Sequence, residues 1–158
     1  WSTWEDLWDH GDWAQQDAEG FWFLHGRADD ALNVAGRKVG PAEIEGVLAE
    51  HDAVTQAAVV GVPDDTTGTA VEAFVIPDPD HDPDDELAAD LRGLVGREQG
   101  KPFRPRELHF VEDLPRTQSG KIIRRAVRSL ARNDDPGDLS SMENPEALAA
   151  LRERLDDG

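Results

Sequence analysis

The sequence predicts a small compact α+β domain, in which a short N-terminal hairpin and a central, roughly three-stranded sheet are flanked by helices. A length of 158 residues fits one domain of ordinary size, and an apolar fraction of 38% is enough to form a core. Two short apolar runs, 57–62 and 71–76, are typical of buried strands. The later segments instead space their apolar residues as amphipathic helices do.

The strands are predicted from apolar runs that end at turn residues. The turn at 63–68 joins two of these runs, and the proline-rich polar segment 77–85 is predicted to be a loop. The predicted strands are residues 21–24, 31–34, 57–62, 71–76 and 108–111.

Four helices are predicted from apolar spacing and from residues that favour helix starts. Pro41 fits a first helical position, and apolar residues then recur to about His51. Leucines over 87–94 and Val95 mark the second helix. Lys121 is predicted to open a third, with an apolar face opposite Arg124, Arg125, Arg128 and Arg132. Asn144 is predicted to cap a last helix that starts at Pro145.

The charge is strongly acidic and uneven along the chain. The net charge is −18, and only three of the basic residues are lysines, Lys38, Lys101 and Lys121. This balance favours a protein of a high-salt cytoplasm, where screening limits self-repulsion, over an ordinary acidic protein. Residues 92–132 nevertheless hold 11 of the 16 basic residues. That segment serves either an anionic ligand or ion pairs within the fold.

Several kinds of site are excluded by the residues present. There is no cysteine, so disulfides and thiolate metal sites are absent. The five histidines lack the spacing of metal ligands, and no metal site is predicted. No apolar run is long enough to span a membrane. A Walker A phosphate-binding loop is excluded, because Pro115 and Ile122 stand where that motif needs glycine and Ser or Thr.

The turn at Ser119-Gly120-Lys121 remains a candidate site. Glycine lets the backbone bend closely, and a lysine at a helix start places a cation where free N–H groups also attract anions. The alternative is that Lys121 is an exposed lysine without function.

Four further motifs occur in order along the chain: Gly11-Asp12, GRADDALNVAGRKVGPAEIEGVL at 26–48, AAVVGVPD at 57–64 and LPRTQSGKIIRR at 114–125. Together they resemble the C-terminal domain of the acyl-adenylate-forming superfamily, which includes acyl-CoA synthetases. The tail at 137–148, GDLSSMENPEAL, is most similar to acetyl-CoA synthetases.

The resemblance implies an AMP-forming acid–thiol ligase that uses ATP, CoA and Mg²⁺, with the metal held mainly by a large N-terminal domain absent from this sequence. Asp12 and Arg27 would bind the nucleotide ribose or its phosphates, and Asp29 would be the hinge. Lys121 would bridge the acyl carboxylate and a phosphate during adenylation.

After rotation about the hinge, the loop 34–40 would face the active site. Gly36 would then let the pantetheine arm pass, and Arg97 and nearby bases would bind CoA phosphates. Lys38 stands where many relatives carry arginine. Relatives are also regulated by acetylation of the lysine in this context, which makes a lysine acetyltransferase acting on Lys121 a candidate partner.

The expected organisation has three parts. Residues 1–28 are the end of the large domain and the approach to the hinge, 29–132 are the lid, and 133–158 are an acidic loop and helix. The tryptophan-rich start suggests a piece of a longer protein, and the chain alone is expected to be catalytically silent. An adenylating domain that serves a carrier protein, and a non-catalytic module that binds nucleic acid or another anion, are the alternatives; the preferred hypothesis has neither a nucleic acid nor a membrane partner.

Overall fold

The structure, a computed structural model, describes residues 12–27 and 30–156. Its body is built on a three-stranded mixed sheet. β5 (Val54–Asp64) and β6 (Gly68–Pro77) form an antiparallel hairpin, and β7 (Glu107–Phe110) pairs with β6 in parallel, so that β6 is the central strand. The three-stranded sheet predicted from the sequence is therefore confirmed.

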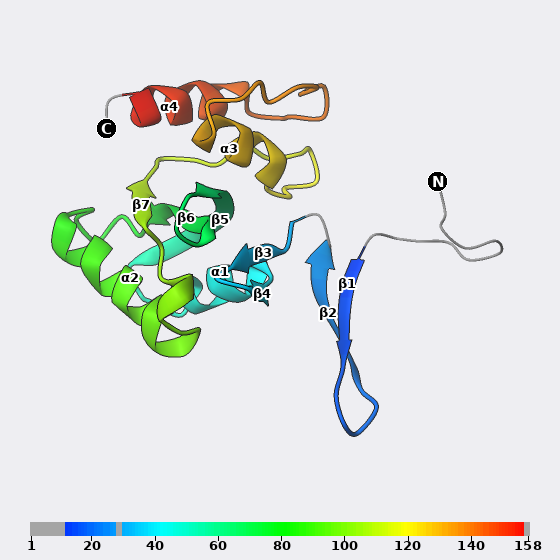
Figure 1. Cartoon of the computed structure of the whole chain (residues 1–158). Coiled ribbons are helices and arrows are strands. Elements are labelled where there is room, and N and C mark those ends of the chain that lie inside the picture. Colours follow the sequence, from blue (N-terminus) through cyan, green and yellow to red (C-terminus); the bar gives the residue numbers. More distant parts are fainter. Residues whose placement is uncertain (1–11, 28–29, 157–158) are drawn as a thin grey trace.

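Helices cover both faces of this sheet (Figure 1). One face packs against α1 (Pro41–Ala49) and α2 (Asp85–Glu98), and the other packs against α3 (Arg124–Ala131) and α4 (Pro145–Asp156). Because side chains alternate along a strand, β5 and β6 contribute to two separate cores. The first core includes Ala57, Val59, Val71, Ala73 and Val75, and the second includes Ala58, Val60 and Phe74. Burial on both faces explains why these strands read as continuous apolar runs.

Two smaller hairpins precede the sheet. β1 (Asp12–Gln16) pairs with β2 (Trp22–Arg27), and this hairpin projects away from the body in Figure 1. β3 (Leu32–Val34) and β4 (Arg37–Val39) form a tight hairpin just before α1. A short 3₁₀ helix, η1 (Lys101–Phe103), follows α2. The α+β class and the N-terminal hairpin are thus confirmed.

One expected helix start and one expected helix cap are wrong, whereas the predicted start of α4 at Pro145 is confirmed. Lys121 does not open α3, which begins three residues later at Arg124. Ile122 instead forms an antiparallel bridge with Arg116, and the Ile123 N–H donates to the Pro115 carbonyl, so these two β-branched residues bond across the hairpin before the helix begins. Asn144 does immediately precede α4, but its side chain bonds to the chain between residues 113 and 116 and not to its own helix.

Over the part of the chain that the structure describes, no helix is both long enough and apolar enough to cross a bilayer.

Candidate functional site

Lys121 lies at the end of a tight hairpin that joins Arg116 to Ile122. The Thr117 N–H donates to the Lys121 carbonyl at 2.9 Å, and the Gly120 N–H donates to the Thr117 carbonyl at 2.8 Å. Gly120 has a φ of 79°, a left-handed conformation that glycine adopts without strain. The Thr117 hydroxyl also accepts the Lys121 N–H at 3.2 Å. The backbone of Lys121 is therefore fixed on both sides by Thr117.

The side chain of Lys121 is exposed. Among the described residues, it has no salt bridge and no side-chain hydrogen bond. An exposed ammonium on a fixed backbone is available to an anion that arrives from outside this chain. In this respect Lys121 differs from the arginines that follow it.

The arginines of α3 and its C-terminal end are used inside the fold. Arg124 donates from Nε to Glu45 at 2.7 Å, and Arg128 pairs with Asp30 at 3.2 Å. Arg125 donates to the carbonyls of Pro136 and Asp138, and Arg132 donates to the Gly61 carbonyl at 3.0 Å. For these residues the structure supports the alternative in which the basic segment forms contacts within its own fold.

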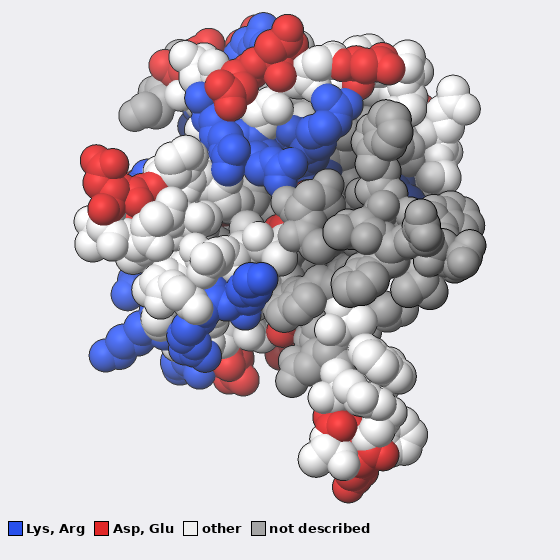
Figure 2. All heavy atoms as spheres, turned by 45° about the vertical axis from the view of Figure 1, so that its right-hand side comes forward, with Lys and Arg blue, Asp and Glu red and all other residues white. Residues whose placement is uncertain are grey.

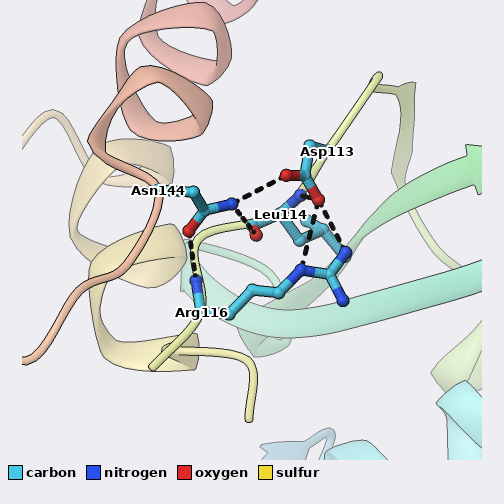
Figure 3. Close-up of polar contacts among 4 residues, drawn as sticks. All are labelled: Asp113, Leu114, Arg116 and Asn144. Atoms are coloured by element: carbon cyan, nitrogen blue, oxygen red, sulfur yellow. Dashed lines mark hydrogen bonds and ion pairs between the residues drawn. The ribbon is translucent and has the colours of Figure 1, made fainter. Parts of the chain in front are cut away.

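The base of the Lys121 hairpin is held by a polar cluster, which Figure 3 shows. Asp113 accepts hydrogen bonds from the Arg116 guanidinium at 2.6 Å and from the Asn144 amide at 2.7 Å. Partial burial opposes ionisation of Asp113, but the hydrogen bonds from Arg116, from the Leu114 N–H and from Asn144 lower its pKa below the usual value. Sequence reasoning missed this cluster, because Asn144 is 31 residues from Asp113.

Gly36 lies in the turn of the β3–β4 hairpin. Ala35 and Gly36 have φ values of 51° and 78°, as a two-residue type I′ turn requires. A side chain at position 36 would have no neighbour within 4 Å, so one side of this turn is open. The turn is tied to the turn between β5 and β6 by the Ala35 N–H, which donates to the Thr67 carbonyl at 3.1 Å.

A second group of cations surrounds this hairpin and the end of α2. The Arg37 guanidinium lies 5.0 Å from the centre of the Phe103 ring, a cation–π contact that sequence reasoning missed because no local signal joins the two residues. The stem of Arg104 packs across Gly96. We call this group the basic face; its members are Arg37, Lys38, Arg97, Lys101 and Arg104, all of them exposed. Figure 2 shows basic side chains in two groups, one at the level of α3 and one at the level of α2 and β4.

Of the predicted CoA-binding residues, Lys38 and Gly36 therefore share one hairpin with the exposed Arg37. Arg97 is only loosely paired, since its guanidinium lies 3.9 Å from Asp90 and both side chains are more than half exposed.

The remaining predicted residues lie at or beyond the edge of the described chain. Asp12 and Arg27 are opposite each other in the β1–β2 register, so the hairpin brings these two positions together. Asp29, the predicted hinge, lies outside the described residues. The described residues contain no group of three or more His, Asp or Glu side chains that fits a metal ion.

The partly buried His109 and the buried Glu72 lie side by side on the sheet, on β7 and β6. His109 stacks on Phe74 with the ring centres 4.9 Å apart, and its Nε2 lies 4.0 Å from Glu72 with no hydrogen-bond partner. Burial lowers the pKa of His109 and raises the pKa of Glu72.

We expect His109 to lower the free energy of unfolding in mild acid. The unfolded chain takes up a proton at His109 near its usual pKa of 6.5, whereas the folded chain keeps it neutral, so stability falls as the pH drops below that value. Glu72 acts in the opposite sense, because its raised pKa makes the folded state take up a proton first. The stability advantage of wild type over His109→Phe should therefore shrink between about pH 8 and about pH 5.5 in urea denaturation. A constant difference between the two proteins would contradict this prediction.

Comparisons with known proteins agree with the motifs. Residues 43–121 match the model of the AMP-binding enzyme C-terminal domain. The chain is 45% identical over 141 residues to acetyl-coenzyme A synthetase of Methanothrix soehngenii, a match that covers 89% of this chain and 21% of that protein. It is 40% identical over 154 residues to acetyl-coenzyme A synthetase of Escherichia coli K12, covering 96% of this chain and 24% of that protein.

A solved structure gives the same relationship. The anthranilate CoA ligase AuaEII, in complex with anthranoyl-AMP, superposes with a TM-score of 0.71 at 37% identity, over 78% of this chain and 24% of that one. The chain thus spans about a fifth to a quarter of the length of the proteins it matches. From its motifs, its fold and these matches, the chain belongs to the AMP-binding enzyme C-terminal domain family and is homologous to the C-terminal part of acetyl-CoA synthetases.

Proposed function

We propose that this chain is the mobile C-terminal domain of an AMP-forming acyl-CoA ligase that acts on acetate or another short-chain acid. In the first step a carboxylate oxygen attacks the α-phosphorus of ATP, and the bond to pyrophosphate breaks. In the second step the CoA thiol gives up its proton to solvent and its sulfur attacks the acyl carbon. The bond between the acyl carbon and the phosphate oxygen breaks, and AMP leaves. The named relatives support acetate, and the acyl pocket belongs to the large domain.

The observation that carries this proposal is the exposed Lys121 ammonium on its fixed hairpin. While the carboxylate attacks, two anionic groups approach each other, and a preorganised cation between them stabilises the transition state. Lys121 has no acid of its own to neutralise it among the described residues. Asp12 and Arg27 would hold the nucleotide from their opposed positions on the hairpin.

The basic face supports the second step. With Asp29 as the hinge, rotation would remove Lys121 and bring the Gly36 turn to the reaction centre. The open side of that turn leaves room for the pantetheine arm beside the backbone. Lys38, Arg97 and the neighbouring cations would then bind the CoA phosphates, and none of the five has a carboxylate within 3.5 Å among the described residues.

The same structure bears on the alternatives. A module that binds nucleic acid through residues 92–132 would have fewer cations than the count suggests, because Arg124, Arg125, Arg128 and Arg132 already have partners within the fold. Only part of the segment, including Arg97, Lys101, Arg104 and Lys121, presents exposed cations without a close carboxylate among the described residues. Such a module also predicts salt-sensitive binding to any polyanion. A domain that serves a carrier protein would not need the basic face.

The test is to follow the two steps separately in the full-length protein. We expect acetate-dependent exchange of pyrophosphate into ATP without CoA, and release of AMP with acetyl-CoA only when CoA is present. The isolated 158-residue chain should release no pyrophosphate. Exchange without any turnover of CoA would favour the carrier-protein alternative, and absence of both reactions with short acids would contradict the proposal.

Three further parts of the proposal concern the setting of the protein. Residues 1–28 would belong with the large domain, 29–132 would form the lid, and 133–158 its acidic extension. The acidic surface and the scarcity of lysine support a cytoplasm of high salt. The exposed Lys121 is also open to a lysine acetyltransferase, and acetylation would remove the charge that adenylation needs.

A further inference from the structure

The Lys121 hairpin has a third strand beside it, supplied by the C-terminal tail. Thr117 forms an antiparallel bridge with Met142, and the Glu143 N–H donates to the Arg116 carbonyl at 2.9 Å. On its other side Arg116 is bridged to Ile122. The tail therefore borders the hairpin on the edge opposite the strand that carries Lys121. This tail lies beyond residues 43–121, which the family model matches.

The Asn144 side chain strengthens this contact, because both its amide oxygen and its amide nitrogen bond to residues 113–116. Its Oδ1 accepts the Arg116 N–H at 2.9 Å, and its Nδ2 donates to the Leu114 carbonyl at 3.0 Å and to Asp113 at 2.7 Å. Asn144 is only 9% exposed, so these hydrogen bonds are largely shielded from solvent. Figure 3 shows these contacts, and a buried amide satisfied in this way fixes its neighbours in one geometry.

The position of Asn144 indicates that the contact to the hairpin has a use. An asparagine just before a helix ordinarily bonds to the first free N–H groups of that helix, which contributes about 1 kcal/mol. Asn144 precedes α4 but directs its side chain to residues 113–116. The sequence thus gives up a local capping bond and gains an anchor for the hairpin.

We propose that Asn144 is a positioning residue for adenylation: it fixes the base of the hairpin, and through the hairpin it holds Lys121 in its reactive place. This inference rests on the proposed role of Lys121 in the first step. It makes the C-terminal tail part of the adenylation machinery. The second step, in which Lys121 takes no part, should not depend on Asn144.

The first test uses Asn144→Ala in the full-length protein. We expect the rate of acetate-dependent pyrophosphate exchange to fall at least about tenfold, since small misplacements of a reacting group are costly. Formation of acetyl-CoA from supplied acetyl-AMP and CoA should stay within about twofold of wild type. An equal fall in both steps, or no fall in the first, would overturn the proposal.

A matched control separates positioning from general destabilisation. Leu148 lies on α4, packs half-buried against the core beneath it, and has an apolar side chain that makes none of the hydrogen bonds of the hairpin cluster. Leu148→Ala should lower the melting temperature while leaving the ratio of the two step rates at its wild-type value. If Leu148→Ala shifts that ratio as strongly as Asn144→Ala does, the effect is structural and the proposal fails.

A reciprocal exchange provides a rescue. Asn144→Asp loses the donated hydrogen bonds and sets a second carboxylate beside Asp113, so adenylation should fall. Adding Asp113→Asn restores a donor and an acceptor between the two positions in the reverse sense, and part of the lost exchange rate should return. A double variant no faster than Asn144→Asp would count against the hairpin anchor. These variants also serve if Asn144→Ala does not fold.

The anchor can be measured without any activity. The Thr117 and Gly120 N–H groups are bonded within the hairpin, and their hydrogen exchange reports its opening. Asn144→Ala should speed exchange at both amides about tenfold, and Leu148→Ala should not. Unchanged exchange in Asn144→Ala would refute the anchor. If the anchor is found but Lys121→Ala leaves adenylation intact, then the proposed function has failed and the anchor stands.

Discussion

Replacing Lys121 by alanine in the full-length protein is expected to abolish acetate-dependent pyrophosphate exchange while sparing the thioester step. The ammonium is exposed and without a partner among the described residues, so its removal leaves no unpaired acid behind and should not unfold the domain. The loss of one preorganised donor costs about 10²–10³ in rate. The measurement compares pyrophosphate exchange with acetyl-CoA formation from supplied acetyl-AMP.

A control variant that also removes one positive charge can be made on α4. Arg152 is exposed and has no part in the hairpin or the basic face. Arg152→Ala should keep both steps near wild type, which separates the loss of a particular cation from the loss of one positive charge. Adenylation by Lys121→Ala within about tenfold of wild type would be incompatible with the role assigned to this lysine.

The second large effect is expected on stability, from Glu45→Ala. Glu45 on α1 accepts the Val59 N–H of β5 at 2.9 Å and pairs with Arg124 on α3. β5 is an edge strand of the sheet, so the carboxylate takes the place of a neighbouring strand at Val59. Removing it leaves a buried N–H and a half-buried guanidinium without their acceptor. We expect the free energy of unfolding to fall by about 3 kcal/mol, measured by urea denaturation.

Two further variants define the origin of that loss. Glu45→Gln keeps an acceptor for the Val59 N–H but not the charge, and should lose about half as much stability. Asp90→Ala removes an acid whose contacts to His51 and Arg97 are exposed, and should change stability by less than about 1 kcal/mol. A loss from Glu45→Ala as small as that from Asp90→Ala would show that the bridge between the two helix layers contributes little.

The sequence predicts the sheet well, because the apolar runs of β5 and β6 are local signals that tertiary structure does not contradict. Helix starts are harder, since they depend on partners far along the chain. Lys121 and Ile122 suit a helix by their spacing, but Ile122 pairs across the turn with Arg116 and delays α3 to Arg124. In the same way Asn144 has the residue type of a helix cap, but its side chain bonds to buried partners at 113–116 and does not cap α4.

The candidate site also combines features that local sequence predicts with contacts that it does not. Gly36, Gly120 and Lys121 can be found from the motifs, because turns need particular residues at particular positions. The partners of the arginines cannot, because charge counts do not tell which carboxylate or carbonyl each guanidinium reaches. The bond between Arg124 and Glu45 spans 79 residues, and the pair of Arg128 with Asp30 spans 98. Net charge along the chain therefore overstates the number of cations offered to a ligand.

Arginine and lysine consequently have different roles in this protein. Many arginines bind carbonyls and carboxylates of the fold, whereas Lys38, Lys101 and Lys121 are all exposed. Within these 158 residues, an amine-selective reagent that carries an isotopic methyl label would mark just these three side chains. In spectra of the labelled full-length enzyme, which also contain the resonances of the large domain, one of the three should respond during activation of the acid and the two others when CoA arrives.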